Sequence, residues 1–419
     1  MIQLKDICDI YDCPHTTAKD EGKGYPLVRT PNVGKGRLIL NGIHRVSEDV
    51  YNSRNARAIP EEDDLILARE APVGNVSIIM DGQRVCLGQR VVLIKPKREL
   101  VDPHFLTYYL LSAEVQHRLK NHANGAVVAH LNVSDIRNLW VTLPEFEEQV
   151  AIGKILRSID DKIELNRQIN DNLEQQAQAL YKSWFVDFEP FKDCEFVDSE
   201  LGIIPEGWQV GTYEQIIQTT ISGDWGKDII TGNYTHKVAC VRGCDFQDMS
   251  IGVRGKTPER YILEKNYQAK RLIDNDVIVE ISGGTSTIST GRVCLINDDL
   301  LGKYNNDIVC TNFCKVVRPI QSYGAYLYYS WKYKYDCRVM FGYENGTSGI
   351  KNFQISDFLS KEPVIIPSES SIKEFQTIID TLQNNIQTNG SEIMKLESLR
   401  DSLLPKLMSG ELEINKIDC

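Results

Sequence analysis

Two long stretches with heptad spacing constrain the fold of this 419-residue chain more than any other feature. Apolar residues recur at alternating intervals of three and four in LPEFEEQVAIGKILRSIDDKIELNRQINDNL, which begins at Leu143. They do so again in SIKEFQTIIDTLQNNIQTNGSEIMKLESL, which begins at Ser371. This spacing places apolar side chains along one stripe of an α-helix. We therefore predict two long helices, over 144–189 and 368–411, each a rod of roughly 60 Å at about 1.5 Å per residue.

The apolar stripe of each helix must be covered, and the simplest partner for each helix is the other one. The alternative is that each helix packs on its own domain as an ordinary amphipathic helix. Asn166, Asn170 and Asn389 fall at core positions, where a buried asparagine commonly fixes the register of paired helices. The residues predicted to line the interface between the helices are Leu156, Ile159, Ile163, Leu173, Ala177, Leu180, Ile379, Leu382, Ile386, Ile393, Leu396 and Leu403.

An internal repeat links the segments that precede the two helices. VRTPNV around Arg29, DLILAREAPVGNV and VCLGQRVVLIKP are followed, in the same order, by VRGCDF around Arg242, DVIVEISGGTSTISTGRV and VCTNFCKVVRP. Arg29 precedes Asp64 by 35 residues, and Arg242 precedes Asp276 by 34. A glycine follows this aspartate after 10 residues in the first copy and after 15 in the second, which predicts a loop of different length.

Each copy alternates short β-branched runs with one clear helix, which indicates the fold class α/β, more fully a mixed α+β domain. We predict two similar globular domains separated by a two-helix antiparallel coiled coil, with a pseudo-twofold internal repeat. A twofold relation between two domain–helix halves makes the helices antiparallel. The predicted boundaries are 1–143 for the first domain, 144–189 for the central helix, 190–205 for a linker, 206–367 for the second domain and 368–411 for the C-terminal helix.

The net charge of −11 is concentrated in the helical segments. Residues 1–144 carry 18 Lys and Arg against 17 Asp and Glu, and residues 201–367 carry 18 against 18, whereas residues 145–200 carry 6 against 14. A basic face on each globular segment is therefore compatible with the overall acidity. No secretory signal and no apolar run of membrane-spanning length occurs, so we expect a cytoplasmic protein without a membrane partner.

Motifs of known catalytic chemistry are absent from the sequence, and we expect no catalytic residue, no metal site and no cofactor held by this chain. No Asn-Pro-Pro-aromatic loop, no Gly-x4-Gly-Lys-Ser/Thr phosphate loop and no His-Glu-x-x-His helix occurs. His236, Cys240 and Cys244, with Cys310 and Cys314, have weak spacing for zinc. The repeat aligns the last two cysteines with apolar residues of the first copy, which favours small buried hydrophobes.

Four segments resemble the specificity subunit of type I restriction–modification enzymes. They are LPEFEEQVAIGKIL at the start of the first helix, LYKSWFVDFEPF (180–191) at its end, GIIPEGWQVGTYEQI (202–216) and LRDSLLPKLMSGEL (399–412). The order of the segments matches over nearly the whole chain, while the intervening domains match in layout. The resemblance implies that each globular domain is a target recognition domain that reads one half of a split site in double-stranded DNA.

The resemblance also implies partners. The paired helices would hold the two domains apart and dock two methyltransferase subunits, which methylate adenine with S-adenosylmethionine. Restriction subunits with a motor and a nuclease, which use ATP and magnesium, would join them. Such a specificity subunit has no catalytic centre, so these cofactors belong to the partners. Trp184, Phe185 and Phe188 fit a methyltransferase interface and core packing equally well.

The residues expected to contact DNA are Arg, Lys, Asn and Gln side chains on loops that contain glycine, together with basic residues among the aromatics of 326–345. Arg reads guanine and Asn or Gln reads adenine in the major groove, whereas phosphate contacts position the protein. The aromatic run also fits a surface helix with core aromatics. The predicted residues are Arg29, Lys35, Arg37, Arg69, Gln89, Arg90, Asn121, Asn124, Arg242, Arg254, Lys256, Arg292, Asn312, Lys332, Lys334, Asn345 and Lys351.

Two other functions fit parts of the sequence. A non-enzymatic coiled-coil scaffold whose two α/β domains bind proteins would show no salt-sensitive DNA binding. An enzyme with an unfamiliar site would need convergent side chains, whereas His15, His44, His130 and His236 are scattered along the sequence.

Overall fold

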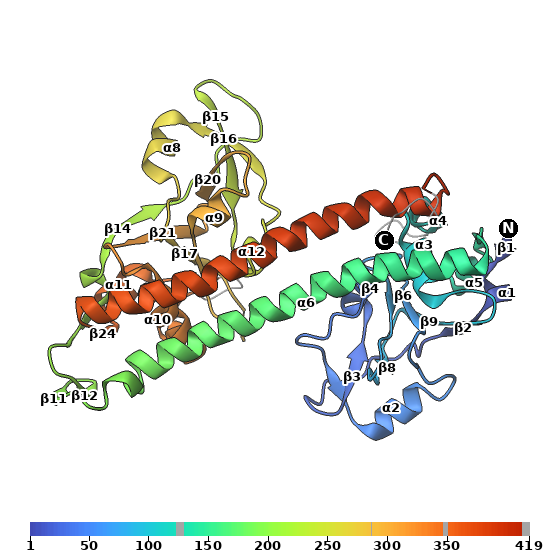
Figure 1. Ribbon diagram of the computed structural model, residues 1–419, viewed down its shortest axis with the longest axis horizontal. Coiled ribbons are helices and arrows are strands. Elements are labelled where there is room, and N and C mark those ends of the chain that lie inside the picture. The colour runs from blue at the N-terminus through green and yellow to red at the C-terminus, as the bar shows by residue number, and fades with distance from the viewer. Residues whose placement is uncertain (123–129, 286, 347–350, 413–419) are drawn as a thin grey trace. The chain divides into compact units, whose positions relative to one another are not determined.

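The chain folds into two compact units, each of which contains a globular domain and a part of both long helices (Figure 1). The first unit comprises Met1–Ile163 and Leu396–Cys419, and the second comprises Glu164–Lys395. The long helices are α6 (Phe146–Phe185) and α12 (Glu369–Met408). The computed structural model describes residues 1–122, 130–285, 287–346 and 351–412.

The first unit is built on a five-stranded sheet in the order β2-β9-β6-β7-β4. Residues of β6 and β9 alternate between two cores, so that Leu65 and Leu67 face α3, α4 and the long helices while Ile66 and Ala68 face a smaller lobe. That lobe contains a three-stranded sheet in the order β5-β3-β8. The strands are β1 (Ile2–Gln3), β2 (Cys8–Asp12), β3 (Tyr25–Val28), β4 (Gly36–Arg37), β5 (Arg45–Val46), β6 (Leu65–Ala68), β7 (Val76–Ile78), β8 (Cys86–Leu87), β9 (Val91–Pro96) and β10 (Trp140–Val141).

Five short helices complete the first domain, together with a 3-10 turn, η1 (Thr30–Asn32). The N-cap of α3 is Asp102, whose side chain accepts a hydrogen bond from the backbone N–H of Phe105 and so satisfies one of the unpaired donors of the first turn. The helices are α1 (Leu4–Ile7), α2 (Glu48–Arg54), α3 (Pro103–Leu111), α4 (Ala113–His122) and α5 (Val133–Arg137).

The second unit repeats this plan with a four-stranded sheet in the order β14-β21-β17-β19 and a three-stranded sheet in the order β16-β15-β20. Its additional pairs are β11 with β12, β13 with β24, and the sheet β18-β23-β22. The strands are β11 (Phe196–Ser199), β12 (Gly202–Pro205), β13 (Gln209–Thr212), β14 (Ile217–Ser222), β15 (Tyr234–Val241), β16 (Glu259–Leu263), β17 (Val277–Glu280), β18 (Ser282–Gly283), β19 (Val293–Leu295), β20 (Asp307–Cys310), β21 (Cys314–Pro319), β22 (Glu344–Asn345), β23 (Lys351–Phe353) and β24 (Pro363–Ile366).

The helices of the second unit include the aromatic helix α10, which occupies the same place as α3 of the first unit and packs in the main core. The segment 190–205, expected as a linker, contains the β11–β12 hairpin. The helices and 3-10 turns are η2 (Glu189–Phe191), η3 (Tyr213–Gln215), η4 (Gly243–Asp245), α7 (Phe246–Ser250), α8 (Glu264–Lys270), α9 (Asp298–Leu301), α10 (Gly324–Asp336), η5 (Val339–Tyr343) and α11 (Ile355–Lys361).

Backbone pairing confirms the internal repeat residue by residue. Val28 pairs with Leu87 in the parallel pair β3–β8, and Val241 pairs with Cys310 in the parallel pair β15–β20. Ala68 of β6 likewise pairs with Val91, at the place where Glu280 of β17 pairs with Cys314. The predicted mixed fold, present in two copies, is therefore confirmed.

The predicted difference in loop length lies between β6 and β7 and between β17 and β19. Gly74 and Gly291 both have φ of +87°. The N–H of Gly74 donates to the carbonyl of Ala68, the last residue of β6, and the N–H of Gly291 donates to the carbonyl of Glu280, the last residue of β17. The longer second copy holds β18 within its extra length. A glycine is required at both places because this φ disfavours side chains.

In each unit the two long helices run antiparallel. In the first unit, Asp160 of α6 binds Arg400 of α12, while Leu156, earlier in α6, shares a core with Leu407, later in α12. The second unit shows the same descending order: Asn166 binds Glu392, Asn170 binds Asn389, and Tyr181 packs on Phe375. The antiparallel pairing predicted from the repeat is thus confirmed within each unit.

The predicted stripe residues are buried or half-buried, and they pack on their own domain as well as on the other helix. Leu156 and Ile152 lie in the core of the first domain, and Ile372, Phe375 and Ile379 lie in the core of the second. Each long helix therefore packs both on the other long helix and on the globular domains, so the two predicted arrangements occur together. Glutamates in the first turn of α6 and a lysine in its last turn favour the ends of the helix dipole.

Asparagines occupy the centre of the helix pair in the second unit. Asn170 is almost fully buried, and its amide donates to the carbonyls of Ile251 (2.9 Å) and Ile386 (3.1 Å). The amide of Asn389 donates to the side-chain oxygen of Asn170 at 2.8 Å. These hydrogen bonds can form in only one axial alignment of the two helices. A polar group inside an apolar helix interface fixes the alignment in this way.

Candidate nucleic-acid interface

Three strands of each domain end at one place, where backbone hydrogen bonds join four separate segments. In the first domain the N–H of Gly88 donates to the carbonyl of Val28 (2.8 Å) and that of Arg69 donates to Arg90 (2.9 Å). The N–H of Leu131 in turn donates to the carbonyl of Arg69 (3.1 Å). We call this place the strand-end edge; in the first domain it comprises residues 29, 69–70, 88–90 and 130–131.

The second domain has the same strand-end edge, built by equivalent bonds. The N–H of Thr311 donates to the carbonyl of Val241 (2.9 Å), and Ile281 is bonded to both Phe313 (2.8 Å) and Phe353 (2.9 Å). This edge comprises residues 242–243, 280–283, 311–313 and 351–353. Within the first edge the fold brings together the predicted residues Arg29, Arg69, Gln89 and Arg90, and within the second edge it brings together Arg242, Asn312 and Lys351.

Arg69 holds the first strand-end edge together from inside. Its side chain is 7% exposed, and its guanidinium donates to the carbonyl of Leu131 (2.8 Å) and to the carboxylate of Asp12 (2.8 Å). The third nitrogen lies 2.7 Å from the ring of His130, which also contacts Glu70. Because these bonds use the guanidinium within the protein, its observed role is to position the neighbouring residues.

Arg90 and Gln89 form the outer part of this edge. The Arg90 side chain is 61% exposed, with one ion pair to Glu70 at 3.0 Å. The Gln89 amide donates to the carbonyl of His15 and to the hydroxyl of Thr17. Arg29 is half-buried, and its Nε has no hydrogen-bond partner among the described residues. A buried donor without a partner is where an acceptor from a ligand is favourable.

The second edge carries a different set of side chains at the same backbone positions. Asn312 is exposed where the first domain has Gln89, and Phe313 is 64% exposed where the first domain has Arg90. Sequence reasoning missed Phe313, although the alignment of Cys314 with Val91 was sufficient to find it. Asn345 is also exposed, on β22 of the neighbouring sheet.

Several basic residues at or near the second edge are held by carboxylates. Arg242 forms a double contact with Asp245 and also donates to the carbonyl of Lys256 (2.8 Å), and hydrogen bonding to Asp245 raises the pKa of Arg242. Arg292 forms a similar double contact with Glu280 (2.8 and 2.7 Å), which raises the pKa of Arg292. Lys351 binds Glu344 at 2.6 Å.

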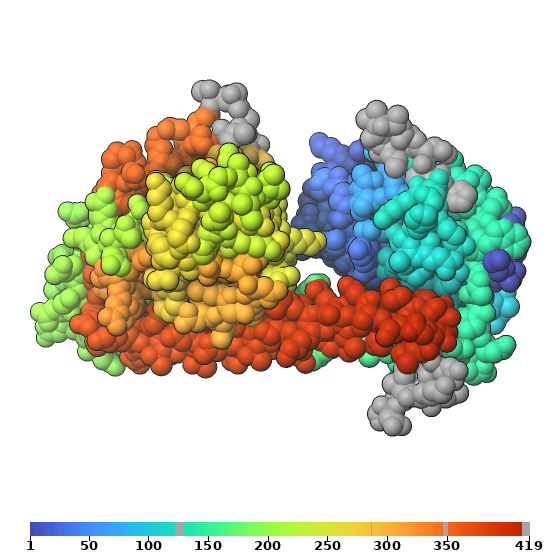
Figure 2. All heavy atoms as spheres, turned by 90° about the horizontal axis from the view of Figure 1, so that it is seen from above, coloured from blue at the N-terminus to red at the C-terminus, as the bar shows by residue number. Residues whose placement is uncertain are grey.

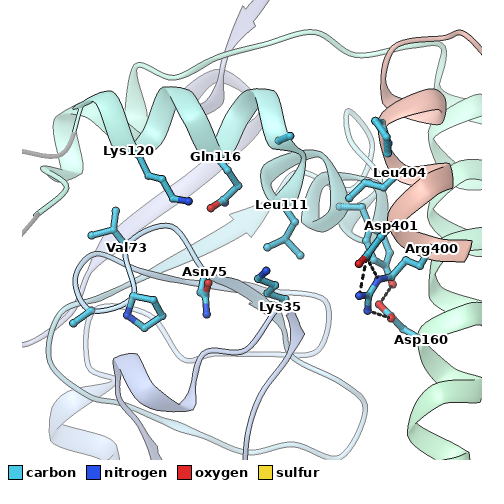
Figure 3. Close-up of a pocket in the computed structure, with 15 residues that line it drawn as sticks. Lys35, Val73, Asn75, Leu111, Gln116, Lys120, Asp160, Arg400, Asp401 and Leu404 are labelled. Carbon is cyan, nitrogen blue, oxygen red and sulfur yellow. Dashed lines mark hydrogen bonds and ion pairs between the residues drawn. The ribbon is translucent and has the colours of Figure 1, made fainter. Parts of the chain in front are cut away.

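Three other predicted residues lie beside the long helices, and a fourth, Lys256, lies next to Arg242. Arg37 forms an ion pair with Asp161 of α6. Lys35 is exposed and lines a groove of about 980 Å³, in which Figure 3 shows Lys120 and Gln116 of α4 opposite the loop that carries Val73. Near α12 lies Arg254, whose N–H donates to Met394 (3.5 Å); Lys256 is exposed, and its carbonyl accepts a hydrogen bond from Arg242.

The aromatic helix α10 carries two further predicted residues, both of which bind carboxylates. Lys332 binds Glu174 of α6 at 2.6 Å, and Lys334 binds Glu362. Tyr326, Tyr329 and Trp331 are buried, so the aromatics of this helix belong to the core. The same holds for Trp184 and Phe185 of α6, which are 8% and 2% exposed. Asn121 is exposed at the end of α4, and Asn124 lies outside the described residues.

Cys240, Cys310 and Cys314 occupy buried sheet positions, whereas Cys244 is exposed on η4. Burial raises the pKa of the Cys240 and Cys314 thiols to about 12 and raises that of Cys310 well above its usual range, which disfavours the thiolates that bind zinc. His236 instead contacts Glu264 (2.7 Å) and Asp307 (2.8 Å). No group of three metal-binding side chains occurs in the part of the chain that the structure describes.

Comparison with known proteins shows which proteins this chain is similar to. Residues 1–175 match the family described as "Type I restriction modification DNA specificity domain". The chain is 25% identical to the type I restriction enzyme MjaIX specificity subunit of Methanocaldococcus jannaschii, over 99% of this chain and 94% of the relative. It is 24% identical to the HindI specificity subunit of Haemophilus influenzae, over 85% of this chain and 88% of the relative.

The fold is shared with a solved structure, the crystal structure of a type I restriction–modification S subunit from M. genitalium. The TM-score is 0.52 at 17% identity, over 97% of this chain and 95% of that chain. The two share an architecture that, in this protein, contains a mixed domain twice, with each copy packed on the long helices. Over nearly its whole length the chain is similar to specificity subunits of type I restriction–modification enzymes, and its first 175 residues match the family model. Among the described residues no helix is long and apolar enough to span a membrane.

Proposed function

We propose that this chain is the DNA-recognition subunit of a type I restriction–modification complex, and that each domain binds one half of an asymmetric, bipartite site. The observation that carries this proposal is the strand-end edge, which occurs twice on the same backbone frame with different side chains. Gln89 and Arg90 in one domain stand where Asn312 and Phe313 stand in the other. Two domains that share a fold and differ in their surface side chains suit two different half-sites.

The long helices serve as the spacer and as the docking surface for two methyltransferase subunits. Helices α6 and α12 together carry 13 acidic against 9 basic residues, and residues 186–200 after α6 carry 6 against 1, so this part of the chain is net acidic, which disfavours contact with phosphates and suits contact with protein. The relatives' names place them in type I restriction enzymes. We infer that this chain has no catalytic centre, and that S-adenosylmethionine, ATP and magnesium are bound by the methyltransferase and restriction subunits in the cytoplasm.

The experiment that tests this function is co-expression of the chain with the adjacent methyltransferase subunit, followed by mapping of N6-methyladenine by single-molecule sequencing. We expect one new split motif with a fixed gap, present with this chain and absent without it. Replacing residues 206–367 by the second domain of a relative should change one half of the motif and leave the other half unchanged.

A protein-binding scaffold is the alternative, and its predictions differ. If the chain is such a scaffold, the assembled complex produces no new methylation and shows no salt-sensitive binding of DNA. A domain replacement that altered both halves of the motif at once would contradict the assignment of one half-site to each domain.

A further inference from the structure

The turn between β20 and β21 presents Phe313 at the strand-end edge of the second domain. Phe313 is 64% exposed, although its backbone is fixed on both sides. Its N–H donates to the hydroxyl of Thr311 (3.0 Å), and its carbonyl accepts from the N–H of Ile281 (2.8 Å). The next residue, Cys314, is fully buried in β21. A large apolar ring is therefore held outward on a rigid support, which lowers the entropy lost on binding.

Backbone hydrogen bonds show that Phe313 is the equivalent of Arg90 in the first domain. The carbonyl of Arg90 accepts from the N–H of Arg69 (2.9 Å), and the carbonyl of Phe313 accepts in the same way from Ile281. Arg69 directly follows β6, and Ile281 directly follows β17, which is the equivalent strand. The two domains therefore place an exposed side chain at the same point of the edge, a guanidinium in one and an aromatic ring in the other.

The side chains beside these two residues also differ. Glu70 contacts Arg90 at 3.0 Å and His130 at 2.7 Å, so that the first edge carries a chain of charged and polar groups. The equivalent pair of the second edge is Ser282 and Asn352, which share one hydrogen bond of 2.8 Å. A carboxylate and an imidazole are thus replaced by two groups without charge.

A further pair of equivalents lies on β2 and β14. Asp12 pairs with Val92 of β9, and Ser222 pairs with Lys315 of β21, at the same distance from the turn. Asp12 forms an ion pair with Arg69, whereas the second domain has a serine and an isoleucine at these two places. The first edge therefore surrounds Arg90 with a charged network, and the second edge surrounds Phe313 with an uncharged frame.

The charged residues that the second edge does contain are paired within the protein. Burial of a charge is costly when its partner is missing, and much less so when the pair stays together. An apolar contact of Phe313 therefore displaces water without leaving an isolated charge behind. The pairs are Arg242 with Asp245, Arg292 with Glu280, and Lys351 with Glu344.

We propose that Phe313 packs on the methyl group of a thymine in the half-site of the second domain and so determines one base of it, an inference that rests on the proposed function. A phenyl ring offers no hydrogen bond to phosphates or to base edges. The thymine methyl is the apolar group that base pairs present in the major groove, and Phe is one of the residues that contact it. Arg90, at the equivalent point, instead offers a charged donor.

The test replaces thymine by uracil, which lacks only this methyl group. The motif is first mapped with the wild-type chain, and the domain replacement described above shows which half-site belongs to the second domain. Duplexes with uracil at each thymine of that half-site in turn are then bound to the assembled complex, and fluorescence anisotropy gives Kd. We expect one replacement to weaken binding by the wild-type complex about fourfold, the factor for one buried group of this size.

The variant Phe313→Ala removes the ring and is compared with the control Ile230→Ala. Ile230 is 61% exposed in the loop before β15, whereas Val241, at the other end of this strand, lies at the edge. Figure 2 shows the yellow-green atoms of this segment at the surface of the second unit. The Phe313→Ala complex should bind the thymine duplex at least fourfold more weakly and lose its sensitivity to uracil. The Ile230→Ala complex should keep both properties of the wild type.

The other outcomes have distinct meanings. A half-site without thymine, equal binding of every uracil duplex by the wild type, or unchanged uracil sensitivity in Phe313→Ala would overturn the inference and leave the proposed function standing. Failure of Phe313→Ala to assemble, where Ile230→Ala assembles, would assign Phe313 to a protein contact and also overturn it. All complexes are compared at a salt concentration low enough for each of them to bind. Absence of any motif with the wild-type chain would instead remove the proposed function itself.

Discussion

Arg69 and Arg90 are two arginines of the same edge with opposite surroundings, and their substitutions should have opposite effects. Arg69→Met removes the guanidinium that pairs with Asp12 and donates to the carbonyl of Leu131. Breaking a buried ion pair from one side costs about 3–5 kcal/mol, since the partner is left uncompensated. We expect a loss of this size in the free energy of unfolding, measured by urea denaturation. A loss below about 1 kcal/mol would contradict the buried role.

Arg90→Ala should leave stability within about 0.5 kcal/mol of wild type, because the side chain is mostly exposed. We expect the assembled complex to bind DNA more weakly. The slope of the logarithm of the binding constant against the logarithm of the salt concentration should fall by about one, as for the loss of one phosphate contact. Fluorescence anisotropy across a salt series measures both quantities. The exposed Arg98 of the same domain, whose contacts lie at Glu62 and Asp63, provides the matched control Arg98→Ala.

Lys303 should make the stability of the second unit depend on pH. Its ammonium donates to the carbonyl of Gly252 (2.6 Å) and to Gln387 of α12, and burial lowers its pKa from 10.5 to about 8. Below pH 8 the group is charged in both the folded and the unfolded state. Between about pH 8 and 10.5 the folded state releases this proton first, so the free energy of unfolding should rise with pH.

The measurement compares urea unfolding of wild type and Lys303→Met from pH 7.5 to 10. Other groups titrate in this range, so the difference between the two proteins isolates Lys303. The wild-type advantage should grow with pH. Equal slopes in the two proteins would contradict the lowered pKa, and the exposed substitution Lys256→Met should reproduce the wild-type slope.

At the scale of elements, Gly390 shows how a contact reverses the usual preference of a helix. Gly390 lies inside α12, where alanine is normally more favourable by about 1 kcal/mol. Here a Cβ would collide with the backbone carbonyl of Gly252. Because overpacking of this kind costs about 1–3 kcal/mol, we expect Gly390→Ala to destabilise the protein in thermal unfolding. Asn385→Ala, at an exposed position of the same helix, should stabilise it slightly.

Elements with a regular spacing of apolar residues could be predicted from the sequence, because the number of residues per helical turn determines that spacing. The heptad spacing located α6 and α12 to within a few residues of their observed ends. The repeat aligned Cys310 and Cys314 with apolar residues of the first copy, and Leu87 and Val91 occupy the equivalent places in the strand pairs. Short strands such as β18 and the β11–β12 hairpin were missed, because two to four residues carry too little pattern.

The chemistry of the site was predicted less well than its position, for a physical reason. Arg69, Arg90, Arg292 and Lys332 are all basic residues near turns or aromatics, and the sequence alone does not separate them. Their surroundings differ because Asp12 and Glu174 arrive from distant parts of the chain, and Glu280 is brought to Arg292 by the pairing of β17 with β19. An ion pair across so many residues depends on tertiary packing, which has no local signature in the sequence.

At the scale of the whole molecule, the proposal makes the helix pair the spacer between half-sites. Inserting one heptad into α6 after Ile163 and one into α12 before Leu396 preserves the seam, because seven residues keep the apolar phase. The insertion lengthens each helix by about 10 Å, close to three base pairs. We expect a methylated motif with both halves unchanged and a gap longer by about three. A motif with the original gap would contradict the spacer role.

The division of both long helices between the units has a consequence for biosynthesis. The second unit is one continuous segment, whereas the first unit needs Leu403, Leu404 and Leu407 to cover Ile152 and Leu156. A ribosome therefore releases the first domain long before the residues that complete its core exist, by roughly ten to fifty seconds at ordinary elongation rates. The domain translated first is the last to be finished, and its unfinished apolar face is what chaperones would meet on the nascent chain.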